Sequence, residues 1–362
     1  MKRFAFILTI FLLVQLLSPA CHAQRDYFDE LEKAVPFEAE KLIPDISGGI
    51  AQNNLNIGFF WSMLLKAVYG AVPQAAGGFA LMLGLILIAS ILGALRDTVL
   101  SKQICEAMEF ISVLTICTAS YSMTSTIFDI AGRFINEMNT FLGGVLPTML
   151  LLSASSGNAS FAAASSAIIL SALSMLEVLC ASTLFPLLKL LFSVSVSSAM
   201  CGSVNLGGVS STIKKLMKYV FVLSGIVLSV VLMFQKIITK SIDSASLRGL
   251  KFAASFVPFV GSSIDEAMAT LSGGIGVIRS TFGISIAVII CAITLIPLMN
   301  LLLNKFFIDL SCGISSMLGL GKESAFLSEM GGVIGYLAAI VAFVGTFFTL
   351  AVSIIAATEV RV

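Results

Sequence analysis

The feature that most constrains this chain is a series of long apolar runs without charged residues. A helix needs about 20 mostly apolar residues to cross a bilayer. The clearest such spans lie at 77–95, 107–127, 166–192, 217–236, 281–303 and 333–356. We therefore predict an all-α fold, a polytopic transmembrane helical bundle of about six to eight membrane segments, some of them half-spanning.

The composition supports a lipid environment. Of the 362 residues, 58% are hydrophobic and only 11% are charged, whereas a soluble domain carries about 25% charged residues. The formal net charge is +1, so the chain lacks the strong positive charge typical of nucleic-acid-binding proteins. We expect membrane lipid as a partner and no nucleic acid.

Histidine is almost absent, which argues against most enzyme classes. The single histidine, His22, lies in a segment that we expect to be removed. A mature chain without histidine has no Ser-His-Asp or Cys-His mechanism and no imidazole for zinc. None of the seven cysteines forms a CxxC pair, and we interpret them as small buried hydrophobes. We predict no enzymatic activity and no cofactor.

The N-terminus has the layout of a secretory signal. Lys2 and Arg3 precede an uncharged run from Phe4 to Leu17, and small residues follow up to Ala23. This order of basic, apolar and small-residue regions predicts a signal peptide over 1–23 with cleavage after Ala23. An uncleaved anchor helix, or a lipoprotein signal that uses Cys21, are the alternatives.

The signal peptide suggests an orientation for the rest of the chain. Residues 24–76 form a polar, amphipathic segment that we expect on the extracytoplasmic side, with Trp61 and Tyr69 as interface anchors. A first transmembrane helix and its loop follow over 77–103. The basic residues at 96–102 and 214–218 then fall inside, as the positive-inside rule requires. Those between 236 and 251 fall outside, against the rule, so that segment is either interfacial or the span count is off by one.

An internal repeat is present at an offset of 111 residues. Residues 180–191 align without gaps on 291–302, and Pro147 falls on Pro258 at the same offset. Because only eight prolines occur in the chain, such matches indicate a duplication. The predicted units are 104–214 and 215–325, followed by a C-terminal transmembrane helix in 326–362. The repeats are either parallel or inverted.

The repeat also bears on membrane topology. Residues 141–157 could pass for a span, but their counterparts at 252–268 contain Asp265 and Glu266. A pair of half-spanning or interfacial segments fits both copies better. Repeated units with broken helices are typical of transporters that build a midplane pathway.

Two charged residues stand inside an otherwise apolar stretch, namely Glu177 and Lys189. Ionisable residues are costly in a membrane and are functional candidates by default. Twelve residues separate them, about 18 Å along one helix, too far for a direct ion pair. They line a polar pathway or contact a partner subunit. Alternatively, Lys189 extends to the interface and Glu177 is satisfied by neighbouring serines.

Proline and glycine mark further structural candidates. Helix kinks are predicted at Pro147, Pro186, Pro258 and Pro297, serving either as hinges or as fixed packing geometry. Gly331 and Gly335 form a GxxxG pattern suited to close helix contact. The stretch Gly319-Leu320-Gly321-Lys322-Glu323 is not a phosphate loop, because a glutamate stands where Ser or Thr coordinates magnesium.

The stretch Leu247-Arg248-Gly249-Leu250-Lys251-Phe252, which leads into Phe256-Val257-Pro258 and Gly261, resembles the stage III sporulation protein AE family of endospore-forming Firmicutes. The Leu146-Pro147 stretch that closes with Ala154-Ser155-Ser156-Gly157 fits the same family. The resemblance covers the whole chain.

The resemblance implies a role in endospore formation. Members are polytopic proteins of the mother-cell membrane around the forespore, within a channel or secretion-like complex. The partners so implied are proteins of the same sporulation stage III A operon, a cytoplasmic ATPase and ring-forming bitopic membrane proteins. The complex supports forespore development and late forespore sigma-factor activity after engulfment. A stand-alone secondary transporter and a purely scaffolding subunit are the alternatives.

Overall fold

The computed structural model describes residues 31, 34–40, 42–43, 57–99, 102–155, 159–200, 206–254 and 261–356, and every regular element within them is helical. The elements are α3 (Phe37–Glu40), α4 (Ile57–Val99), α5 (Lys102–Ser155), α6 (Ala159–Leu179), η2 (Cys180–Leu184), α7 (Phe185–Met200), α8 (Gly207–Ala254), α9 (Gly261–Met317) and α10 (Gly321–Ala356). The predicted signal peptide and Pro258 lie outside the described residues.

Six stretches of these helices are long and apolar enough to cross a membrane. They are Gly58–Ala94, Glu106–Thr148, Ala167–Met200, Gly207–Phe234, Gly283–Met317 and Gly321–Ser353. Each overlaps one of the six clearest spans predicted from the sequence. The fold is therefore the predicted all-α, polytopic helical bundle.

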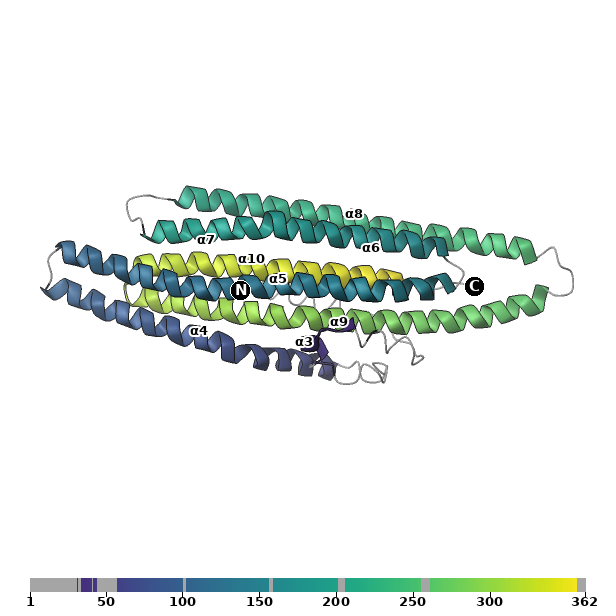
Figure 1. Cartoon of the computed structure of the whole chain (residues 1–362), viewed down its shortest axis with the longest axis horizontal. Coiled ribbons are helices and arrows are strands. Elements are labelled where there is room, and N and C mark those ends of the chain that lie inside the picture. The colour runs from purple at the N-terminus through teal and green to yellow at the C-terminus, as the bar shows by residue number, and fades with distance from the viewer. Residues whose placement is uncertain are drawn as a thin grey trace.

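The long helices lie side by side and alternate in direction (Figure 1). The hairpin of α9 and α10 forms the centre of the bundle. In the most apolar 18-residue stretch of each helix, 78% and 67% of the residues are buried inside the protein. The corresponding shares are 22% for α4 and 17% for α8, which lie at the periphery. α4 and α5 cover one side of the hairpin, and α7 and α8 cover the other.

Small residues explain how closely α9 and α10 approach. A Cβ added to Gly345 would overlap the Thr294 side chain. At the predicted GxxxG, a Cβ on Gly331 would overlap the Asp309 carboxylate, and one on Gly335 would meet Lys305 at 3.4 Å. The close helix contact expected of this motif is present.

Two helices are much longer than a bilayer is thick. α5 has 54 residues and α9 has 57, which corresponds to about 81 Å and about 86 Å against a hydrocarbon core of about 30 Å. Residues 141–157 were predicted as a half-spanning or interfacial segment broken at Pro147, and the break is wrong, because residues 141–155 continue α5 without interruption. Phe141 and Leu142 are fully buried and Leu146 nearly so, and this packing keeps the helix continuous through Pro147.

The chain passes Pro186 by widening the helix. Residues Cys180–Leu184 form a single π-helical turn in which the Phe185 N–H donates to the Cys180 carbonyl. A proline ring collides with the carbonyl four residues earlier, here that of Ser182, and the wider turn gives that carbonyl more room. Pro297, its predicted counterpart, lies inside α9.

The predicted duplication would pair α5 with α8 and α6–α7 with α9. α5 and α8 run in one direction along the bundle, and α6–α7 and α9 run in the opposite direction (Figure 1). This arrangement corresponds to parallel repeats, and the duplication itself stays a prediction. The basic segment 236–251 belongs to α8, at the end of the bundle opposite the α9–α10 turn. The two explanations of its conflict with the positive-inside rule, an interfacial segment or a miscounted span, both stay predictions.

Candidate polar groove between α4, α5 and α9

The two charged residues chosen from the sequence lie on the outside of the bundle. Glu177 on α6 and Lys189 on α7 are both exposed. Within the described part of the chain, the Lys189 ammonium lies 5.6 Å from the centre of the Phe128 ring, a cation–π contact. Neither residue lines the cavities between α4, α5 and α9 described below, and their predicted role in a polar pathway or a helix contact stays a prediction.

A polar groove instead lies between α4, α5 and α9. It consists of two cavities of about 260 Å³ and 250 Å³ that share Gln74 and Ile130 in their walls. The polar side chains that line the first are Glu38, Gln74, Arg133, Glu137 and Asn300. The second is lined mainly by apolar residues, and its polar side chains are Gln74, Ser122, Thr126 and Asn304. α3 contributes Glu38 at one end.

Helical periodicity explains how one face of each helix lines the groove. On α5 the lining positions include 119, 122, 126, 130, 133 and 137, spaced three or four residues apart as on one side of an α-helix. The rise from 119 to 137 is about 27 Å, close to the hydrocarbon thickness of about 30 Å. The groove is thus long enough to cross most of a bilayer core.

Pro297 adds hydrogen-bond acceptors to the wall. Because proline has no N–H, the Ile293 carbonyl one turn earlier loses its helical donor, and both residues line the first cavity. The Asn300 amide nitrogen donates to the Ile296 carbonyl at 3.3 Å, while its buried Oδ1 has no hydrogen-bond partner among the described residues. Buried acceptors of this kind are normally satisfied by water or a ligand.

Charges of both signs line the same cavity. Arg133 and Glu137 lie one turn apart on α5 and attract each other, and Glu38 adds a second carboxylate. Ionisable side chains at membrane depth face a bundle interior or a water-filled cavity. No group of three metal-binding side chains occurs in the described ranges. The arrangement fits water and small polar groups.

Sequence reasoning missed these residues. The signal was available, since Arg133 and Glu137 stand at i and i+4 between two apolar runs, and Asn300 follows Pro297 by three residues. Each looked like an interruption between spans. Only the packing of α5 on α9 shows that they face one another across a cavity.

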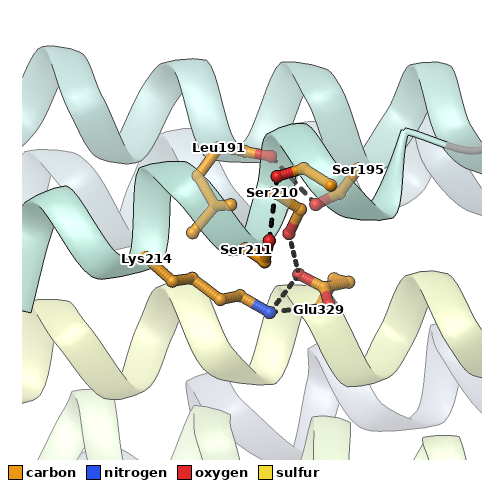
Figure 2. A network of polar contacts seen from close by, with 7 residues as sticks. Leu191, Ser195, Ser210, Ser211, Lys214 and Glu329 are labelled. Carbon is orange, nitrogen blue, oxygen red and sulfur yellow. Dashed lines mark hydrogen bonds and ion pairs between the residues drawn. The ribbon is translucent and has the colours of Figure 1, made fainter.

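A separate polar network holds α8 against the centre of the bundle (Figure 2). The Lys214 ammonium on α8 lies 2.6 Å from Glu329 Oε2 on α10, and the Ser210 hydroxyl donates to the same oxygen at 3.0 Å. The neighbouring Ser195 donates to the Leu191 carbonyl of its own helix at 2.9 Å. Three polar atoms thus join two helices that are otherwise linked by apolar contacts.

The start of α10 is tied to α5 in a similar way. Lys322 pairs with Glu109 at 2.9 Å, and the Ser112 hydroxyl donates to Glu323 Oε1 at 2.9 Å. Glu323 is only 3% exposed, and its carboxylate lies where a phosphate loop would hold a hydroxyl.

Comparison with known proteins identifies the family. The model of the family described as Stage III sporulation protein AE matches residues 37–359. A protein of Bacillus subtilis (strain 168) with the name Stage III sporulation protein AE is 26% identical over 227 residues, which cover 62% of this chain and 57% of that relative. No solved structure matches the chain. Together with its six candidate spans, these matches show that this multi-pass membrane protein belongs to the stage III sporulation protein AE family.

Proposed function

We propose that this protein is a membrane-embedded component of a channel or secretion-like complex in the mother-cell membrane around the forespore. It serves forespore development and late forespore sigma-factor activity after engulfment. The observation that carries the proposal is the polar groove between α4, α5 and α9. Such a groove in a helical bundle is costly unless water or a solute uses it. Family membership supplies the sporulation context.

The same proposal includes partners. A cytoplasmic ATPase and ring-forming bitopic membrane proteins of the same operon would supply energy and a continuation of the path. The groove's walls combine Arg133 with Glu137 and hold polar groups without a strong preference for one sign of charge. In this account the chain lines a passage and its partners drive transport.

A groove-filling substitution tests the proposal. Gln74 lies in the walls of both cavities, so Gln74→Phe should obstruct the groove where they meet. Leu65→Phe is the matched control, because Leu65 lies on the same helix, is 37% exposed and lines neither cavity. In sporulating cells, Gln74→Phe should halt development after engulfment while vegetative growth stays normal.

Two outcomes would count against a passage. If the Gln74→Phe variant is present in the membrane and sporulates like Leu65→Phe, the groove carries nothing essential. If deletion of the whole chain stops sporulation while several groove-filling variants do not, the protein acts as a scaffold. Solute uptake by the purified chain alone in liposomes would favour a stand-alone secondary transporter.

A further inference from the structure

The outer face of α6 and α7 carries two charged side chains that no described residue neutralises. Glu177 and Lys189 are exposed, and neither side chain forms an ion pair or hydrogen bond with a described residue; the Lys189 ammonium lies over the Phe128 ring. The span Ala167–Met200 has 34 residues. Its midpoint lies about 10 Å from Glu177 and about 8 Å from Lys189 along the helix.

In a bilayer centred on this span, both charges fall within the hydrocarbon core. A bilayer core of about 30 Å extends about 15 Å on each side of its centre. A charged side chain at such a depth costs about 2.5–3.5 kcal/mol when it faces lipid, even by the lower scale. The cation–π contact offsets part of this for Lys189, but Glu177 has no such compensation from the described residues.

The π-helical turn brings the two charges onto one face. In an uninterrupted α-helix, twelve residues at about 100° each would place Glu177 and Lys189 about 120° apart. A π turn takes up about one extra residue without extra rotation, which reduces the angle to about 20°. The turn at Cys180–Leu184 lies between the two residues, so the charges line up along one side of the helix.

The buried side of the same helix confirms this geometry. Its buried residues Leu176, Cys180, Leu184 and Leu188 follow one another at intervals of four. In an uninterrupted α-helix, each step of four residues would rotate the buried position around the helix axis by about 40°. The π turn cancels most of the rotation that accumulates over the three steps. One continuous buried stripe therefore faces the bundle, and one continuous charged stripe faces outward.

The residues between the charges suit helix contact. Val178 and Leu190 are 63% and 51% exposed, and the exposed Ala181 and Ser182 between them are small. Small residues let a second helix approach closely, and the flanking apolar side chains supply contact area.

We propose that this stripe is the docking site for a transmembrane helix of a different protein. That helix carries a basic residue at the depth of Glu177 and an acidic residue about 18 Å away, at the depth of Lys189. A second copy of this chain in the same membrane orientation is a poor occupant. Its Glu177 lies at the same depth, so the two carboxylates would repel each other and neither would meet a lysine.

The proposal requires only that α6 and α7 lie in a bilayer and is independent of what the groove passes. Glu177→Lys would place two basic groups together at the docking site. We expect this variant to lower spore yield by more than about tenfold, given the cost of a like-charge contact in the membrane. Glu106→Lys is the control, since Glu106 is exposed near the start of α5, and it should leave spore yield unchanged.

Suppressors of Glu177→Lys identify the occupant. The expected suppressor replaces Lys or Arg with a neutral or acidic residue in a transmembrane segment of another protein. A photo-crosslinker at Val178 should join that same protein in cells with Glu177, fail to do so with Glu177→Lys, and do so again in the suppressed strain. Where Glu177→Lys lowers the membrane level of the chain, Glu177→Gln with the same crosslinker replaces it, and loss of the crosslink is again expected.

Three results would overturn the docking site. These are a wild-type spore yield for Glu177→Lys, a crosslink from Val178 only to lipid or to a second copy of this chain, and suppressors that all fall within this chain. The Gln74→Phe test of the groove is read separately. If the stripe proves to have no partner, the proposal that the groove is a passage still stands. If Gln74→Phe has no effect on sporulation, the proposed docking site still stands.

Discussion

The stretches Cys180–Leu191 and Cys291–Leu302 share a sequence pattern but lie in opposite surroundings. The first forms η2 and the start of α7 on the outside of the bundle, and the second lies in the central helix α9. Leu190 is 51% exposed, whereas Leu301, at the equivalent position, is fully buried. We call these two stretches the outer copy and the inner copy of the predicted repeat; at its offset of 111 residues, Lys189 aligns with Asn300, which lines the groove.

The comparison shows that a shared proline does not dictate the local helix geometry. Pro186 follows a π-helical turn, while the helix around Pro297 stays α-helical. In the inner copy, Thr294 packs against Gly345 of α10 and donates to the Ile290 carbonyl at 2.7 Å. This contact holds the inner copy in α geometry. The outer copy has no helix on its exposed side and is free to widen.

The largest expected difference between the copies is in stability. Leu301→Ala should lower the free energy of unfolding by about 2–5 kcal/mol, because it leaves a cavity in the centre of the bundle. Leu190→Ala should change it by less than about 0.5 kcal/mol, as is usual for surface positions. Thermal denaturation of both variants in detergent compares them directly. Equal losses would mean that the two copies are packed alike.

The next prediction concerns the contact that holds the inner copy. Gly345→Ala places a methyl group where Thr294 lies and should destabilise the α9–α10 hairpin by about 1–3 kcal/mol. Gly332→Ala is the control on the same helix, since nothing lies within 4 Å of a Cβ at that position. Alanine favours helix over glycine, so the control should be neutral or stabilising.

A smaller effect is expected where the outer helices are tied to the centre. Lys214 and Glu329 form an ion pair in which both side chains are 33% exposed. Lys214→Met and Glu329→Gln, combined in a double-mutant cycle, should show a coupling of about 1 kcal/mol. A coupling indistinguishable from zero would mean that apolar packing alone holds α8.

The smallest expected effect on stability is that of Pro297→Ala. The new N–H can donate to the Ile293 carbonyl, and the gain in helix hydrogen bonding offsets the lost packing. We expect a change below about 1 kcal/mol, together with a less polar groove wall. Pro186→Ala, on the outside, should leave the groove unaltered. Hydrogen exchange at residue 297 would show whether the new amide is protected.

Much of the fold could be predicted from the sequence, because membrane spans are determined by long apolar runs. All six clear spans fall on helices, and the GxxxG at Gly331 and Gly335 packs as expected. The end of α5 was misjudged, since Pro147 suggested a break that buried neighbours prevent. Local residue preferences cannot reveal such tertiary packing.

The groove could not be predicted for a related reason. Its residues come from four helices, and their individual patterns say which face is polar but not which faces meet. Glu177 and Lys189 could be recognised from the sequence as unusual. The sequence left open whether they line a pathway or face a partner, and the structure places both on the outer face. The π-helical turn that aligns them has no clear sequence signal, because the same pattern is α-helical in α9.

The central claim is that the groove between α4, α5 and α9 is hydrated, and cysteine accessibility tests it most directly. Thr126→Cys and Asn304→Cys place a thiol in the groove wall, while Leu223→Cys places one on an outward-facing position of α8 that is 63% exposed and lies near the middle of its span. The parent chain with its native cysteines gives the background.

In membrane vesicles, a water-soluble maleimide should label the two groove thiols about tenfold faster than the Leu223→Cys thiol, because only a hydrated thiol ionises readily. Labelling of all three at the same slow rate would contradict the account.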